Sequence, residues 1–222
     1  MIIVMKKAIL SCLGLILVLS SCVKEPAPVP TGEARVRFVN ALPGSSAQDY
    51  YINDAKKNVS GLVYGDASPQ FTFISGRNDF IFTNEGSTTV SAGSREVVPI
   101  GASFTAFYVK NQAGQASVAV APDDNAVVEG KAKVRFIHLN TFLNASIKIT
   151  NQATGAVLTE GVGLGNGSNY FQVDVGTKFV LTATGLTTPP VVETTLVAGK
   201  NYTIWFGGAT ATALDYHVIL QN

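Results

Sequence analysis

The chain has 222 residues, with 16 basic and 15 acidic side chains and a formal net charge of +1. Charged residues make up 14% of the chain, well below the roughly 25% that is usual for soluble proteins, and hydrophobic residues make up 46%. The balanced charge argues against a nucleic-acid-binding protein, which needs a concentrated basic face. The hydrophobic content argues against an intrinsically disordered chain.

Residues 1–21 have the pattern of a secretory leader. Lys6 and Lys7 form a short basic start, and residues 8–19 form an apolar stretch. This stretch is shorter than the roughly 20 apolar residues that a transmembrane helix needs. Met5 is a better start than Met1, because starting at Met1 puts apolar residues ahead of the positive charge; both starts remain open.

The leader ends at Leu19-Ser20-Ser21-Cys22, which resembles the bacterial lipobox. The resemblance implies cleavage before Cys22 and acylation of this residue. Several acyl chains would hold the protein on a membrane, since each buried CH₂ contributes about 0.8 kcal/mol. The alternative is an ordinary signal peptide with an incidental cysteine. Cleavage also removes Cys12, so the mature chain would have no free thiol.

Residues 22–33 contain three prolines and indicate an extended stalk between the lipid and the folded part. Lys24 and Glu25 faintly resemble the signals that send some Bacteroidetes lipoproteins to the cell exterior, and solvated charge is the alternative. We therefore expect a lipid-anchored protein of the cell envelope, in the outer membrane of a Gram-negative, Bacteroidetes-like bacterium. Whether it faces the periplasm or the exterior stays open.

The rest of the chain repeats itself at an offset of 98 residues. The segment 34–40 (ARVRFVN) matches 132–138 (AKVRFIH), and 101–108 (GASFTAFY) matches 199–206 (GKNYTIWF). Matches in the same order at a constant offset predict a tandem duplication. The expected domains are residues 34–121 and 131–222, joined by a polar linker at residues 122–130 that is rich in Asp, Asn, Pro and Gly.

Each copy has the pattern of short β-strands separated by Gly, Asn and Asp turns. Strands are expected at residues 36–38, 71–74, 80–83, 104–109, 134–136, 147–150, 170–173, 179–182, 202–206 and 217–220. No window keeps an apolar stripe at helical spacing. The sequence therefore predicts an all-β protein with two tandem antiparallel Ig-like β-sandwich domains.

Several of these elements resemble the domain-of-unknown-function family 4397. The first copy supplies residues 34–44, residues 49–53, Gly76, Gly101 and residues 104–105, and the second supplies a Gly-x-x-Tyr-Thr strand at residues 199–203. The second copy departs from the pattern at residues 141–144, which lack the expected Pro and Asp. The resemblance implies an exported Ig-like β-sandwich and brings no assigned activity.

Few residues suggest catalysis or metal binding. His138, His217 and Asp215 could together serve as metal ligands or as an acid–base group, and the alternative is polar residues at strand ends. Asp123 and Asp124, with Asn125, offer oxygen ligands suited to Ca²⁺, and the alternative is solvated linker charge. The glycines at residues 161–167 indicate a hairpin connection, because no helix follows to hold a pyrophosphate. We expect no catalytic residue, metal or cofactor.

Four aromatic residues are candidate ligand contacts. Tyr50 and Tyr51 are adjacent, so on a strand they face opposite sides and one lies outside the sandwich. Phe107 and Trp205 occupy equivalent positions in strands that are apolar on both faces, which leaves one face for exposure. Exposed aromatics stack on sugars or partner proteins, and edge-of-core packing is the alternative.

These features predict a non-enzymatic cell-envelope lipoprotein that acts as a binding or structural (adhesion) module. Its expected partners are the membrane, through acyl chains on Cys22, and an envelope protein or polysaccharide, but no nucleic acid. The alternative is an accessory glycan-capture lipoprotein of a polysaccharide uptake system. An enzyme that uses His138, His217 and Asp215 is the third hypothesis, and it requires these three side chains to meet in one pocket.

Overall fold

A computed structural model describes residues 30–212 and 214–222 of the chain. The expected leader, the Cys22 lipidation site and most of the expected stalk lie outside the described residues. Residues 31–222 form one compact unit. Within the described part, no helix is long and apolar enough to cross a membrane.

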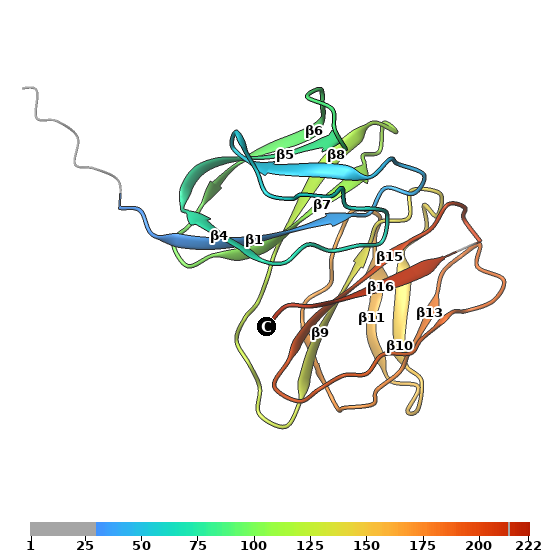
Figure 1. The fold of residues 1–222 in the computed structure, drawn as a ribbon. Helices are drawn as coiled ribbons and strands as arrows, with labels where there is room; N and C mark the ends of the chain where they lie inside the picture. Colours follow the sequence, from blue (N-terminus) through green and yellow to red (C-terminus); the bar gives the residue numbers. More distant parts are fainter. Residues whose placement is uncertain (1–29, 213) are drawn as a thin grey trace, which may run out of the picture. The chain divides into compact units, whose positions relative to one another are not determined.

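All regular structure in the described residues is β-strand, in two groups of strands that we call the N-lobe (residues 33–122) and the C-lobe (residues 132–220) (Figure 1). The N-lobe strands are β1 (Glu33–Asn40), β2 (Gln48–Ile52), β3 (Ala55–Lys56), β4 (Phe71–Ile74), β5 (Gly76–Asn84), β6 (Val90–Val98), β7 (Ser103–Lys110) and β8 (Ala116–Pro122). The C-lobe strands are β9 (Ala132–His138), β10 (Ile147–Asn151), β11 (Val157–Val162), β12 (Phe171–Val173), β13 (Phe179–Thr182), β14 (Val191–Val192), β15 (Asn201–Gly207) and β16 (Asp215–Leu220).

Each lobe is a sandwich of two four-stranded sheets. The N-lobe sheets have the strand orders β4-β1-β7-β8 and β3-β2-β5-β6. The C-lobe sheets have the orders β12-β9-β15-β16 and β11-β10-β13-β14. The prediction of an all-β sandwich architecture is confirmed.

One strand pair in each lobe is parallel, whereas the sequence pattern predicted antiparallel pairing throughout. β1 pairs with β7, and β9 pairs with β15, in parallel. Parallel neighbours need a long crossover connection, and here the intervening strands of each lobe provide it. Arg35 lies opposite Ser103, and Lys133 lies opposite Asn201, so both pairs have the same register at an offset of 98 residues.

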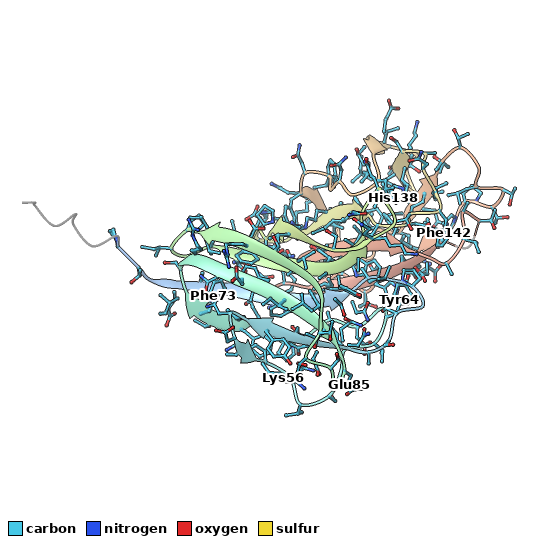
Figure 2. The ribbon with its side chains drawn as sticks, turned by 90° about the horizontal axis from the view of Figure 1, so that it is seen from above. Lys56, Tyr64, Phe73, Glu85, His138 and Phe142 are labelled. Atoms are coloured by element: carbon cyan, nitrogen blue, oxygen red, sulfur yellow. The ribbon has the colours of Figure 1, made fainter. Side chains whose placement is uncertain are left out.

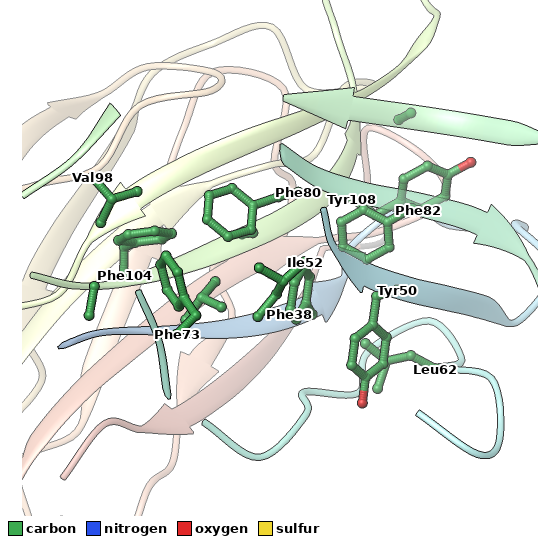
Figure 3. Packing of buried hydrophobic residues seen from close by; sticks show 14 of the residues in the cluster. Phe38, Tyr50, Ile52, Leu62, Phe73, Phe80, Phe82, Val98, Phe104 and Tyr108 are labelled. Atoms are coloured by element: carbon green, nitrogen blue, oxygen red, sulfur yellow. The ribbon is translucent and has the colours of Figure 1, made fainter. Parts of the chain in front are cut away.

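Alternating apolar residues place the core between the two sheets of each lobe. In β1, Ala34, Val36 and Phe38 are buried while Arg35 is exposed, as a strand with one face on a core requires. Aromatic rings fill the N-lobe core, where Phe38 stacks on Tyr50 with ring centroids 4.7 Å apart (Figure 3). The C-lobe core is built similarly, and Phe136 stacks on Phe206 at 6.1 Å.

A third apolar cluster, which we call the interlobe core, lies between the lobes. It is formed by the outer faces of the β4-β1-β7-β8 and β12-β9-β15-β16 sheets. Its buried members are Val39, Ala41, Phe107, Val109, Ile137, Leu139, Trp205 and Ile219. Strands β7 and β15 are apolar on both faces because one face packs inside its own lobe and the other packs against the neighbouring lobe.

Candidate functional site

The aromatic end of the interlobe core contains Trp205, the largest fully buried side chain among the described residues. Its ring stacks on His217 with centroids 4.1 Å apart, and it meets Tyr64 and Phe107 edge-on at 6.0 and 6.4 Å. Phe107 and Trp205 are 1% and 0% exposed. The expectation that one of them contacts a ligand at the surface is wrong, because both side chains are buried between the two lobes.

The two adjacent tyrosines of β2 face opposite sides, as the sequence predicted. Tyr50 is buried in the N-lobe core at 4% exposure, which removes it as a surface ligand contact. Tyr51 lies on the outer face, paired across strands with Ile81 and Lys56, and is half-buried. It lines a shallow hollow of about 200 Å³ together with Asn53, Asp54, Ile81, Thr83, Thr88 and Val90. We call this surface the Tyr51 face.

The two histidines do not meet in one site. His138 pairs across strands with Phe206 and so shares its face of the sheet, which is the face of the C-lobe core. His217 pairs with Trp205, on the opposite face, and packs in the interlobe core. Asp215 lies beside His217, with a closest N–O distance of 3.6 Å, and His138 is on the other face of the sheet. The hypothesis of a joint site of His138, His217 and Asp215 is therefore wrong.

His138 instead holds the loop that follows β9. Its Nε2 atom lies 2.9 Å from the Leu143 carbonyl oxygen, and its ring is fully buried. Burial lowers the pKa of His138 below its ordinary value, although the hydrogen bonds to the backbone of Leu143 and Ala145 oppose this shift. The surroundings of His138 therefore favour the neutral imidazole, and its role is to hold the loop.

A buried polar cluster, which we call the polar clamp, lies beside the interlobe core. Arg37 of the N-lobe donates to the carbonyl oxygen of Leu220 at the end of β16, and Arg135 of the C-lobe donates to the carbonyl oxygen of Pro122 at the end of β8. Arg135 also donates to Asp123 at 2.5 Å. Each lobe thus fastens the last strand of the other.

Asp123 is the centre of the polar clamp. It accepts hydrogen bonds from Thr105 Oγ1 at 3.1 Å and from Gln221 Nε2 at 2.5 Å, in addition to the bond from Arg135. Its side chain is 2% exposed. Burial raises the pKa of Asp123 above its ordinary value, and the positive charge of Arg135 only partly opposes this shift.

Asp123 and Asp124, the two linker carboxylates considered as Ca²⁺ ligands, each have a cationic partner, and only Asp123 has a buried side chain. Asp123 is ion-paired with Arg135, and Asp124 is ion-paired with Lys133. The hydrogen bond from Lys133 lowers the pKa of Asp124. Among residues 30–212 and 214–222, no group of three or more His, Cys, Asp and Glu side chains is placed to hold a metal ion.

A long groove, which we call the seam groove, runs along one side of the boundary between the lobes. Its largest section has a volume of about 780 Å³ and begins at the polar clamp. A second section of about 330 Å³ adjoins it and shares Ala119, Leu139, Gly165 and Asn166 with it. A third section of about 520 Å³ continues to Phe142 and shares Gln112 and Leu164 with the second.

The two lobes contribute different elements to the seam groove. The N-lobe supplies β8 and the hairpin that joins it to β7, and the C-lobe supplies β9 with the loops at residues 139–144 and 163–170. Phe142 belongs to the C-lobe and is 51% exposed; it is labelled in Figure 2. The groove was not predicted from the sequence, because it depends on how the lobes pack. The arginines at the equivalent positions 37 and 135 were the signal in the sequence for contacts between the lobes.

The opposite side of the same boundary is filled by side chains. Tyr64, also labelled in Figure 2, donates a hydrogen bond from its hydroxyl to Asp215 Oδ1 at 3.0 Å and accepts one from the Gly208 amide at 2.9 Å. Its ring meets His217 edge-on at 5.5 Å. Burial, followed by the negative charge of Asp215, raises the pKa of Tyr64, so this hydroxyl stays protonated.

Comparison with solved structures finds only distant likeness. A family CBM26 carbohydrate-binding module of Eubacterium rectale Amy13K, solved with maltoheptaose, is 12% identical with a TM-score of 0.28, over 86% of this chain and 97% of that one. The tip fimbrial protein Mfa3 of Porphyromonas gingivalis is 10% identical with a TM-score of 0.29, over 86% and 100%. A putative cell adhesion protein of Bacteroides eggerthii is 12% identical with a TM-score of 0.20, over 87% and 97%.

No curated protein matches the sequence. The family described as "Domain of unknown function (DUF4397)" matches residues 34–146. This match begins at β1 and extends through the N-lobe into the first strand and loop of the C-lobe. The match covers half of the sequence, and the chain belongs to the DUF4397 family.

Proposed function

We propose that this protein is a non-enzymatic binding module of the cell envelope and that the seam groove is its binding surface. The observation that carries the proposal is the groove itself, which extends over three adjoining sections along one side of the lobe boundary. Ligand sites in proteins are typically concave and largely pre-formed. The interlobe core and the polar clamp hold the walls of the groove in place.

Retention on an insoluble envelope preparation tests this role. Asn166 is exposed in the middle of the groove, so Asn166→Trp would obstruct it with little effect on the fold. The matched control is Val59→Trp, which adds the same bulk at a fully exposed position of the N-lobe. We expect the first variant to lose retention and the second to keep it. Equal retention of both variants would refute the groove as the binding surface.

The proposed attachment to the envelope is through lipid on Cys22. The support for it is the Leu19-Ser20-Ser21-Cys22 motif at the end of an apolar leader. Cys22→Ala should release the protein from membranes and end its labelling by radioactive palmitate. Continued labelling of this variant would rule out the anchor. Protease treatment of intact cells would distinguish a surface-exposed protein from a periplasmic one.

We further propose that the two lobes arose by duplication of one domain. The parallel strand pairs have the same register 98 residues apart, and the backbone amides of Gly65 and Gly165 bond to the equivalent carbonyls of Asn40 and His138. The reciprocal bonds of Arg37 and Arg135 also involve equivalent partners. An experimental structure in which the lobes superpose at offsets of 98–100 residues would support duplication, and one with unrelated strand registers would refute it.

A second candidate function is glycan capture for a polysaccharide uptake system. The Tyr51 face favours it, because a half-buried tyrosine lies there beside the polar side chains of Asn53, Asp54 and Thr88. Aromatic rings next to hydrogen-bonding groups suit sugar rings. Tyr51→Ala should increase the mobility of the protein in a gel containing the polysaccharide, while Tyr51→Phe should not. Unchanged mobility of both variants would count against this function.

A further inference from the structure

We infer that the seam groove binds an extended, uncharged oligosaccharide. The inference rests on the proposed binding role of the groove and names the chemical class of its ligand. It concerns the seam groove and not the Tyr51 face. Four features support it: the contrast between the two sides of the lobe boundary, the pairing of the charges in the groove, the unpaired amide groups along its length, and the apolar surface beside them.

The two sides of the boundary carry different side chains at equivalent positions. On the filled side are Tyr64, Asp215 and His217, which contact one another. The equivalent positions on the groove side hold Leu164, Ser117 and Ala119, all three of which line the groove. The same framework is therefore closed by large side chains on one side and left open by smaller ones on the other.

Most of the charge at the floor of the groove is cancelled within the protein. Arg135 is paired with Asp123, and Lys133 is paired with Asp124. Among the described lining residues, Lys110 is the charged side chain without an ionic partner. A polyanion or a phosphorylated peptide needs a concentration of unpaired cations, which this lining lacks.

Amide side chains are the main free hydrogen-bonding groups of the groove. Five of them are exposed, and in the described structure their side chains make no hydrogen bond: Gln112, Asn144, Asn166, Asn169 and Gln172. An amide both donates and accepts hydrogen bonds, which complements a sugar hydroxyl that does the same. The amides lie in all three sections of the groove, so a ligand that uses them must be extended.

Apolar surface is available for the faces of sugar rings. Phe142 is 51% exposed at one end of the groove, and Leu164 lies beside it. Tyr170 lines the other end, but Arg135 and Lys133 already lie over its ring at 5.2 and 5.4 Å from the centroid, so Phe142 supplies the open stacking surface. Sugar rings have apolar faces and polar edges, and this combination of aromatic and amide groups matches both.

Titration calorimetry of the purified full chain with cellohexaose, maltohexaose, xylohexaose and mannohexaose tests the inference, with hexagalacturonate as the charged counterpart. We expect at least one neutral hexaose to bind and hexagalacturonate to bind more weakly. Phe142→Ala should weaken binding about tenfold, because it removes a stacking surface worth about 1.4 kcal/mol. Ile74→Ala removes an exposed apolar side chain that lies in neither the seam groove nor the Tyr51 face, and as the matched control it should leave the affinity unchanged.

The filled side of the boundary supplies the design of a closed groove. The triple variant Ser117→Asp, Ala119→His, Leu164→Tyr copies Asp215, His217 and Tyr64 onto the groove side, and we expect it to fold and to lose binding. Binding by no neutral hexaose, tighter binding of hexagalacturonate, or loss of binding only in Tyr51→Ala would each overturn the inference. If the wild type is still retained on envelope material when no hexaose binds, the ligand class is wrong and the proposed binding role remains.

Discussion

Replacing Trp205 by alanine tests whether the two lobes form one cooperative structure. Trp205 is fully buried between them, and substitution of a buried tryptophan by alanine typically costs about 3–5 kcal/mol. The indole Nε1 has no hydrogen-bond partner in the described structure, and burying such a group costs about 1–3 kcal/mol that the variant recovers. The midpoints of these two ranges differ by about 2 kcal/mol, and we therefore expect a net loss of about that size in the free energy of unfolding.

Guanidinium unfolding of the full chain, followed by circular dichroism, measures this loss. The wild type should unfold in one transition, and Trp205→Ala should separate the unfolding of the two lobes, because the interlobe core couples them. Trp205→Phe keeps an aromatic ring against His217 and removes the unpaired N–H, so it should cost less than about 1.5 kcal/mol. A loss below about 0.5 kcal/mol for Trp205→Ala is typical of a surface substitution and would refute the burial of Trp205 in the interlobe core.

Three further predictions concern the clamp, the buried histidine and a crowded glycine. Asp123→Ala leaves Arg135 buried without its carboxylate and should cost about 3–5 kcal/mol in chemical denaturation. His138 has a folded-state pKa below its unfolded value of about 6.5, so its contribution to stability is complete above that pH; denaturation midpoints should fall as the pH drops below it. Gly65→Ala places a Cβ atom 2.6 Å from the His217 ring at a φ of +91°, and should cost more than about 2 kcal/mol in unfolding free energy.

Each of these predictions has a matched control. Asp123→Asn keeps the shape of the side chain and should be milder than Asp123→Ala; equal costs would contradict the role of the ion pair. His138→Asn introduces the residue found at the equivalent position 40 and should remove the pH dependence of the denaturation midpoint. A pH dependence that persists in this variant would have another source. Gly44→Ala has a similar φ of +74° with no atom near its Cβ, so it should cost only about 1–2 kcal/mol. The same cost at both glycines would argue against the contact with His217.

Local sequence patterns predicted much of the fold, because burial within one lobe follows alternation along a strand. The alternation of Val36 and Phe38 with Arg35 and Arg37 identified β1 and its inward face. The parallel pairing of β1 with β7 was not predicted, since periodicity reports which residues are buried and not which strands are neighbours. The turn at Asn53, with a φ of +54°, follows the known tolerance of asparagine for this backbone region.

The candidate site could be predicted only in part, because it depends on contacts between the lobes. The sequence showed that Phe107 and Trp205 lie on strands with two apolar faces, and exposure was inferred because each domain was considered alone. Burial of both faces by a second lobe explains the same pattern. Arg135 shows the same difficulty: an arginine on a strand predicts a solvent-facing edge, whereas its partner Asp123 comes from the preceding linker and encloses it.

The contacts between the lobes are isologous, as in a dimer with two-fold symmetry: Val39 and Ile137, and Phe107 and Trp205, are equivalent positions in one interface. A single lobe made alone would expose this row of apolar residues and would be expected to self-associate at high concentration. Joining two lobes in one chain makes the pairing intramolecular, so its stoichiometry no longer depends on protein concentration. Because each face is covered by the other, this interface is closed and leaves no complementary face from which a filament could grow.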